Sequence, residues 1–252
     1  MNYQIPKEVK ADLAQQENSM EKIYFDGCSY TWGQSLELYC NNLDKFAIDR
    51  LSKYVFTKED IEFINKNRYS FIVSNYTKCE EKNNSVSGKS NGKILKDIES
   101  ININEYKYVV IQLTHFDRFF TNGREWKADP VCYKPMISCG EITNEIVEYS
   151  ILNSEKIQYD YFLQLEKIFV DCSEKLKIIF HSDEWEDILS YDEIQRYGIS
   201  IDGEYMIKRW AEQNKMFINQ QPEFKGDKNL THDTHLCIEG HKILAESIIK
   251  QL

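Results

Sequence analysis

The chain has 252 residues, which suits one large α/β domain or two small ones and leaves room for a sizeable core. Hydrophobic residues make up 42% and charged residues 29%, an ordinary composition for a soluble globular protein. The formal net charge of −10 repels phosphate backbones, so nucleic acid is excluded as an expected partner.

Seven cysteines are spread along the chain, and no two of them form a C-x-x-C pair. Their odd number and the lack of zinc-ligand spacing predict reduced thiols and a cytoplasmic protein, without a metal site. Residues 1–20 are polar and mixed in charge, which predicts a tail or a poorly anchored helix and no signal peptide. No apolar run is long enough to predict a membrane span.

Four segments predict β-strands, at residues 22–26, 78–82, 106–113 and 176–181. The run Val109-Val110-Ile111 in the third suits a strand that is buried on both faces. Helix-like apolar spacing falls between and after these strands, at residues 32–38, 42–76, 94–98, 145–172 and 238–250. Residues 121–140 read as a loop, and residues 183–230 as short helices mixed with loops.

Strands that alternate with helices predict a parallel sheet with helices on both sides. Ligands of such sheets bind beyond the carboxyl ends of the strands. Ser29, Gly88 and Thr114 each follow a predicted strand, so we expect them to gather at that edge. Long excursions from this core cover residues 40–68, 120–140 and 183–230.

A serine lies between turn-prone residues just beyond the first strand, in Gly27-Cys28-Ser29-Tyr30-Thr31-Trp32-Gly33. Free N–H groups at a helix N-terminus favour developing negative charge there. A serine in such a turn becomes a nucleophile when a neighbouring base takes its proton. The alternative interpretation is that Ser29 or Thr31 caps the helix.

The segment Asp233-Thr234-His235 supplies an acid and a base just before the last predicted helix. A carboxylate that orients a histidine completes the group that activates a serine. The alternative is a polar loop in which Asp233 caps the last helix and the histidines are solvated. His232 adjoins the same acid and is the rival base, whereas His241 falls within the helix and is expected to pack or to face solvent.

These motifs resemble the sequence blocks of the SGNH (GDSL-like) hydrolases. Residues 27–33 resemble the first block, G-D-S-x-T-x-G, with Cys28 in place of the usual aspartate. Residues 83–88 resemble the second block, N-x-G-x-x-G, with Ser85 in place of the first glycine. Asp233-Thr234-His235 followed by Gly240 resembles the fifth, and together the blocks span residues 22–252 in the family's order.

The resemblance implies a three-layer α/β/α sandwich with a flavodoxin-like parallel sheet of about five strands and helical insertions, over residues 21–252. It implies a serine esterase that needs no cofactor and hydrolyses a small acyl ester, with acetyl groups on a carbohydrate as the first guess. Ser29 is then the nucleophile, His235 the base and Asp233 its orienter. The N–H groups of Ser29 and Gly88 form the oxyanion hole.

The third block, G-x-N-D, departs most from the family, because the matching residues are Gln112-Leu113-Thr114-His115. The asparagine that completes the oxyanion hole is missing, and Thr114 or Asn91 is its expected replacement. Loss of one such donor typically costs about 10²–10³ in rate. The spacing D-x-H is also shorter than the D-x-x-H of many members.

His115 and Arg118 follow the third strand and are the expected substrate-binding residues, with an ion pair between Arg118 and Asp117 as the alternative for the arginine. Two other functional classes stay open. A catalytically degenerate binding protein on the same fold is favoured by the altered third block. The third class is an assembly component that docks through residues 1–20. The acyl group, the choice between hydrolysis and acyl transfer, and the oligomeric state stay open.

Overall fold

The computed structural model describes residues 20–40, 57–86, 88–116, 118–121, 124–127, 154–172, 174–224, 230 and 233–252, with the backbone alone for residues 118–121, 124–127 and 154. The tail expected at residues 1–20 lies outside the described residues except for Met20, and so does most of the first excursion.

The core is a parallel sheet with the strand order β2-β1-β3-β6. Its strands are β1 (Lys22–Asp26), β2 (Glu80–Asn83), β3 (Tyr106–Leu113) and β6 (Leu176–Phe180). Phe25 of β1 pairs with Asn83 of β2 on one side and with Val110 of β3 on the other. The carboxyl ends of these strands therefore open on one edge, as predicted.

The predicted α/β class and parallel sheet are confirmed, but the described residues contain four strands rather than about five. Beyond β6 the described residues make only two isolated parallel bridges, which join Ile178 to Gly198 and Phe180 to Met206. Between them it turns back at Asp202 and Gly203, which both have positive φ. This reversal prevents residues 198–206 from continuing as a fifth strand.

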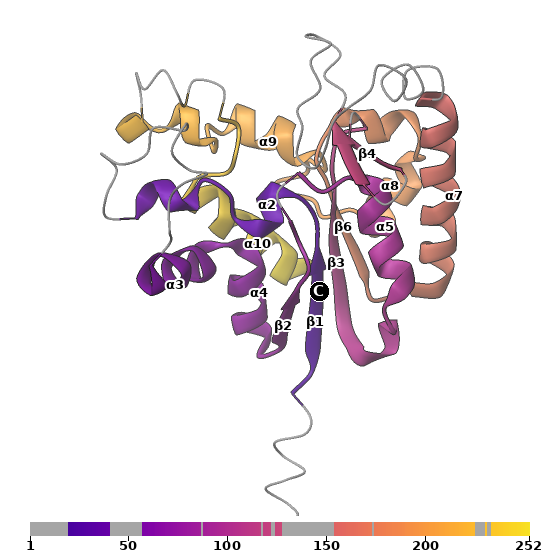
Figure 1. The fold of residues 1–252 in the computed structure, drawn as a ribbon, viewed down its shortest axis with the longest axis horizontal. Helices are drawn as coiled ribbons and strands as arrows, with labels where there is room; N and C mark the ends of the chain where they lie inside the picture. The colour runs from indigo at the N-terminus through magenta and orange to yellow at the C-terminus, as the bar shows by residue number, and fades with distance from the viewer. Residues whose placement is uncertain are drawn as a thin grey trace, which may run out of the picture.

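Helices cover both faces of the sheet, so the molecule has three layers (Figure 1). One face is covered by α3 (Lys58–Asn67), α4 (Tyr69–Thr77) and α10 (Ile238–Gln251), and the other by α5 (Asn91–Ser100), α7 (Ser154–Cys172) and α8 (Tyr191–Tyr197). Side chains alternate along β1: Ile23 and Phe25 join the apolar cluster of the first face, and Tyr24 joins the other. This period of two fits strands buried on both sides.

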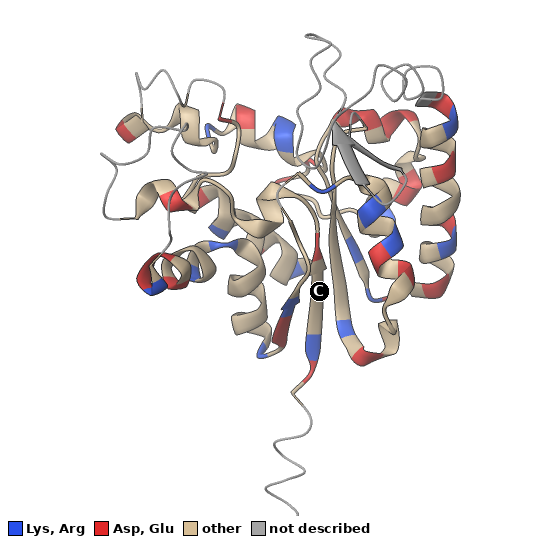
Figure 2. Ribbon diagram, in the orientation of Figure 1, with Lys and Arg blue, Asp and Glu red and all other residues tan. Residues whose placement is uncertain are grey.

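Charged residues lie mainly on the helices and on the edge strand β2, whose sequence is Glu-Glu-Lys-Asn (Figure 2). Charge on an edge strand discourages pairing with another chain. None of the helices in the described ranges is long and apolar enough to cross a membrane.

Two segments differ most from the sequence prediction. The first helix, α2 (Ser29–Trp32), begins earlier than expected and ends at Gly33, whose φ of 87° is left-handed; the 3₁₀ helix η1 (Leu36–Tyr39) follows. The stretch expected to be a loop begins with a hairpin of β4 (Arg118–Thr121) and β5 (Arg124–Lys127), and residues 128–153 lie outside the described part. The last excursion is, as expected, short helices: η5 (Asp183–Asp187), α8, α9 (Ile207–Gln213), η6 (Ile218–Gln220) and η7 (Pro222–Phe224).

Candidate active site

The turn after β1 is closely packed against β3. A Cβ atom on Gly27 would lie 2.3 Å from Oγ1 of Thr31 and 2.8 Å from Cβ of Gln112, so only glycine fits there. Thr31 donates through its N–H and its hydroxyl to Oε1 of Gln112, at 3.2 and 2.9 Å. These bonds fix α2 on β3 and hold the whole turn at the carboxyl edge of the sheet.

Ser29 is the first residue of α2 and is 3% exposed. The N-cap is Cys28, which makes no side-chain capping bond, so neither Ser29 nor Thr31 has the capping role of the alternative interpretation. The Ser29 hydroxyl donates to Sγ of Cys28 at 3.8 Å and makes no hydrogen bond with His235. The structure thus places the serine at the predicted edge, with its hydroxyl turned toward the adjacent thiol.

The acid and the base form a close pair in the loop before α10. Nδ1 of His235 lies 2.7 Å from Oδ1 of Asp233, and the His235 N–H donates to the same oxygen at 2.9 Å. Asp233 does not cap α10, because the N-cap is Cys237, whose sulfur accepts from the Gly240 N–H at 3.4 Å. His232 lies outside the described residues.

Ser35 supports this pair, and the sequence motifs did not indicate it. Its hydroxyl donates to Oδ2 of Asp233 at 2.8 Å. Its φ of 73° is left-handed, a conformation that is unfavourable for a non-glycine residue. Burial raises the pKa of Asp233, but the bonds from His235 and Ser35 outweigh it and hold that pKa below its usual value. Asp233 is therefore charged at neutral pH and can keep a proton on Nδ1 of His235.

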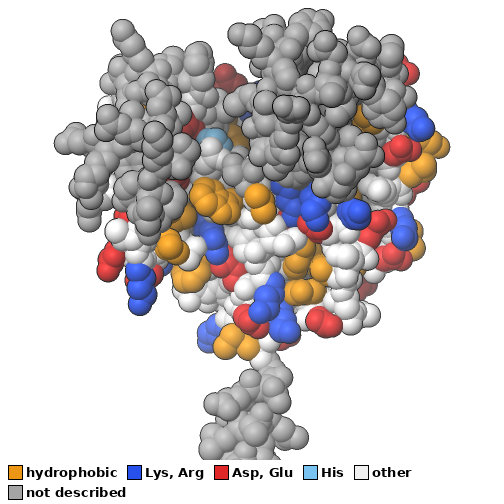
Figure 3. Space-filling view, viewed as in Figure 1, with side chains coloured by type: hydrophobic (Ala, Val, Ile, Leu, Met, Phe, Trp, Pro, Cys, Tyr) orange, Lys and Arg blue, Asp and Glu red, His pale blue; other side chains and the backbone are white. Residues whose placement is uncertain are grey.

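Tyr30 joins the serine turn to the acid–base loop. Its hydroxyl donates to the carbonyl of Thr234, and its ring centroid lies 5.7 Å from that of His235. Because Tyr30 adjoins Ser29, segments from the two ends of the chain meet at one edge. A histidine side chain is exposed at the carboxyl edge of the sheet (Figure 3).

Three hydrogen-bond donors that lack acceptors follow neighbouring strands. Neither the Ser29 nor the Gly88 N–H donates to any described residue, and the buried Thr114 hydroxyl also has no partner among them. The Val86 N–H donates to the Gly27 carbonyl at 3.2 Å, which fastens the loop of Gly88 to the serine turn. Donors without an acceptor at one edge are available to stabilise a developing oxyanion.

Asn91 is occupied with the backbone of the loop after β3. Its Nδ2 donates to the carbonyls of Thr114 and His115, at 3.0 and 3.3 Å, and its Oδ1 accepts from the Thr114 N–H at 2.7 Å. Both amide hydrogens are thereby used. The contacts of Asn91 therefore position Thr114.

A buried ion pair stabilises the loop that contains Gly88. The ammonium group of Lys89 is 2% exposed and pairs with Asp26 at the end of β1 and with Asp97 of α5, the latter at 2.8 Å. It also donates to the Asn84 carbonyl at 2.9 Å. A charged residue ending an apolar strand was a visible signal in the sequence, but nothing there identified Lys89 as its partner.

Two further buried groups surround the acid–base loop. Burial raises the pKa of Glu37 in η1. His241 is fully buried in α10, and its Nδ1 accepts from the Tyr69 N–H at 3.4 Å. Burial lowers the pKa of His241 to about 3, so it is neutral and packs within the core.

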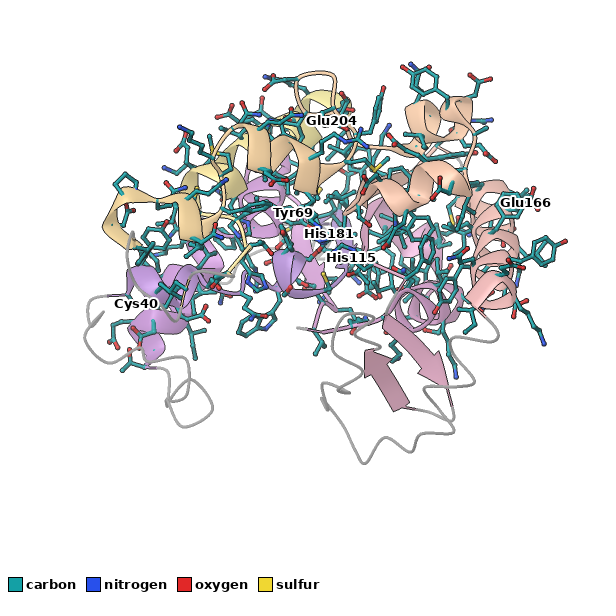
Figure 4. All side chains as sticks on the ribbon, turned by 90° about the horizontal axis from the view of Figure 1, so that it is seen from above. Cys40, Tyr69, His115, Glu166, His181 and Glu204 are labelled. Atoms are coloured by element: carbon teal, nitrogen blue, oxygen red, sulfur yellow. The ribbon has the colours of Figure 1, made fainter. Side chains whose placement is uncertain are left out.

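His115 lies beside His181 and next to α2, seen from the carboxyl edge of the sheet (Figure 4). Arg118 begins β4, and its side chain lies outside the described part. In the described ranges, no group of three or more histidine, cysteine or acidic side chains is placed to hold a metal ion.

No family model and no curated protein matches this chain. Among solved structures it is similar to a lipolytic protein of the G-D-S-L family from Desulfitobacterium hafniense, with 13% identity, a TM-score of 0.36, and coverage of 92% of this chain and 99% of the other. A carbohydrate esterase with divergent catalytic and non-catalytic binding functions is 14% identical, with a TM-score of 0.39 and coverage of 92% of this chain and 68% of the other. A GDSL-like lipase from Bacteroides thetaiotaomicron is 14% identical, with a TM-score of 0.33 and coverage of 96% of this chain and 95% of the other. Identities and TM-scores this low carry no conclusion about the family or function of this chain.

Proposed function

We propose that the protein is a serine esterase that hydrolyses a small acyl ester, with Ser29 as nucleophile, His235 as general base and Asp233 as its orienter. The observation that carries the proposal is the 2.7 Å contact between His235 and Asp233, in a loop that Tyr30 joins to the serine turn. The unpaired donors at the same edge add the electrostatic part of the site.

In the proposed reaction, Ser29 Oγ attacks the ester carbonyl while Nε2 of His235 takes the hydroxyl proton. The negative charge on the carbonyl oxygen is stabilised by the N–H groups of Ser29 and Gly88. Collapse of the tetrahedral intermediate expels the alcohol, which receives the proton from His235. Water, deprotonated by His235, then releases the acid and restores the serine. The hydroxyl begins this reaction by rotating from Cys28 toward His235.

Thr114 is the proposed third donor of the oxyanion hole. Its hydroxyl is buried, has no partner among the described residues, and follows the strand next to β1. Asn91 fixes the Thr114 backbone on both sides, so the hydroxyl belongs to a rigid segment. A preorganised donor contributes because it needs no rearrangement when the charge develops.

Turnover of 4-nitrophenyl acetate by the wild type and by Ser29→Ala tests the proposal. We expect the wild type to release nitrophenolate and Ser29→Ala to lose at least about 10³ in kcat/KM. Ser100→Ala, which changes an exposed serine of α5, is the matched control and keeps its activity. Equal rates for the wild type and Ser29→Ala would overturn the assignment.

A non-catalytic binding protein is the second candidate. It is favoured by the contact of Ser29 with Cys28 rather than His235, and by the missing asparagine of the third block. This candidate predicts no turnover by the wild type, and equal affinity of the wild type and Ser29→Ala for an acetylated sugar in a calorimetric titration.

A further inference from the structure

A second carboxylate–histidine pair lies at the same edge of the sheet. Nδ1 of His115 is 3.6 Å from Oε2 of Glu184, which also accepts from the Phe116 N–H at 3.0 Å and the Ser182 hydroxyl at 3.2 Å. The contact with His115 holds the pKa of Glu184 below its usual range, although partial burial opposes it. Glu184 is therefore a charged carboxylate that lies next to Nδ1 of His115 and favours a proton on that nitrogen.

The His115 ring is connected to the candidate nucleophile through two aromatic contacts. Its centroid lies 4.4 Å from that of His181, which lies 4.7 Å from that of Tyr30, and both contacts are edge-to-face. Tyr30 adjoins Ser29 and contacts His235. Figure 4 shows His115 and His181 together beside α2. A substrate whose ester lies at Ser29 reaches His115 by extending along this edge, past Tyr30 and His181.

The backbone that carries His115 is held on every side. Thr114 and His115 are bound by Asn91, and the Thr114 carbonyl also accepts from Nε1 of the buried Trp185 at 3.1 Å. Phe116 is held by Glu184. A side chain on a fixed backbone, with a fixed ring orientation, binds a ligand with little loss of conformational entropy.

Nε2 of His115 has no hydrogen-bond partner among the described residues, and the side chain is 25% exposed. A neutral ring that donates from Nδ1 accepts at Nε2, and a protonated ring donates there. A hydroxyl group satisfies both forms because it donates and accepts. A carboxylate suits only the protonated form, and the charged Glu184 beside the ring would repel it.

We propose that His115, oriented by Glu184, is a subsite that binds a hydroxyl group of the substrate, so that the esters this protein takes are those of polyols or sugars. The proposal rests on the esterase function for the identity of the ester, but the subsite binds without catalysis. Its loss is therefore measurable separately from turnover.

The test is the affinity of a monoacetylated methyl glycoside for the Ser29→Ala protein, measured by NMR titration of the histidine ring signals. His115→Phe keeps a ring against His181 and removes both nitrogens. We expect its Kd to rise about tenfold, the value of one hydrogen bond. His115→Gln supplies an amide that donates and accepts, and we expect it to recover part of the affinity. Tyr191→Phe, on the exposed side of α8, is the control.

An unchanged Kd in His115→Phe, or no binding of the glycoside by the Ser29→Ala protein, would overturn the subsite. Should His115→Phe fail to fold, Glu184→Gln tests the same proposal, because a neutral amide orients the ring less firmly; we expect its Kd to rise about threefold. Failure of the esterase proposal shows elsewhere, as nitrophenyl acetate turnover that does not depend on Ser29.

Discussion

The two halves of the candidate site are held in different ways. The serine half consists of the turns after β1, β2 and β3, and it is fixed by backbone bonds and by the buried pair of Lys89 and Asp26. The acid–base half is a loop in which the side chains of Asp233 and His235 are 11% and 21% exposed. The carbonyls of Asp233 and His235 accept from N–H groups of residues 218–219 in the last excursion, and side-chain bonds from Ser35 and Tyr30 join the loop to the turn after β1. The first half is part of the core, whereas the second is attached to it.

Because of this difference, we expect substitutions in one half to affect stability and substitutions in the other to affect activity. Substitutions in the buried network of the serine half remove interactions that also hold the sheet together, so we expect them to lower the free energy of unfolding. Substitutions in the acid–base loop leave the core intact, so we expect them to affect turnover with little effect on the free energy of unfolding.

The largest expected effect is that of Asp233→Asn on activity. The amide no longer holds the proton on Nδ1 of His235, and in a serine triad this change lowers kcat by about 10⁴. The measurement is turnover of 4-nitrophenyl acetate, together with a thermal melt that we expect to change little. Asp192→Asn, an exposed residue of α8, keeps its activity. A fall in kcat of less than tenfold would contradict the role of Asp233.

Lys89→Met is expected to be the most destabilising change. It leaves Asp26 buried without its cation, which costs about 3–5 kcal/mol in the free energy of unfolding. Lys93→Met is the matched control, because Lys93 pairs with the same Asp97 but its side chain is 36% exposed; we expect less than about 1 kcal/mol. Urea denaturation compares the two, and similar losses in both variants would refute a special role for burial.

The pH dependence of stability reports on His241, which packs under the acid–base loop. Its folded-state pKa of about 3 lies below the ordinary 6.5, so the unfolded chain takes up a proton first. The contribution of neutral His241 to the free energy of unfolding is complete above pH 6.5 and falls as the pH decreases toward 3. Between pH 6.5 and 5 we expect the free energy of unfolding to fall by about 2 kcal/mol. His241→Asn should lack this part of the slope; identical slopes in both proteins would mean that His241 is not buried as a neutral ring.

The smallest effect is expected from Ser35. Ser35→Ala removes the hydroxyl bond to Asp233 and should lower kcat about tenfold. Ser35→Gly removes the same bond but relieves the left-handed backbone, so it should be about 1 kcal/mol more stable than Ser35→Ala and equally slow. If Ser35→Gly recovered the activity as well, backbone strain rather than the hydrogen bond would be the cause.

The sequence predicted the parts of this molecule that depend on local pattern. β1 and β3 have the predicted bounds because their apolar runs are bounded by turn residues. Ser29, Asp233 and His235 stood out because a nucleophile, an acid and a base need particular residue types. The early end of α2 was missed, because its cause is a left-handed Gly33 followed by a left-handed Ser35.

Partners that are distant in the chain were not predictable from the pattern. The bond of Ser35 to Asp233 and the pair of Lys89 with Asp26 exist only because the fold brings together segments that are distant in the chain. Asn91 was expected as a donor to the oxyanion hole, and its contacts with the Thr114 backbone could be seen only in three dimensions. Glu184 carried no signal, because its role depends on the position of His115 after a different strand.

The most direct test of the central claim is covalent labelling with a fluorophosphonate, which reacts with a serine only when a base activates it. The Ser29 oxygen displaces fluoride and forms a phosphonate ester. We expect one label on the peptide that contains Ser29, and none in Ser29→Ala or His235→Gln. No label on the wild type, or labelling that persists in Ser29→Ala, would contradict the central claim.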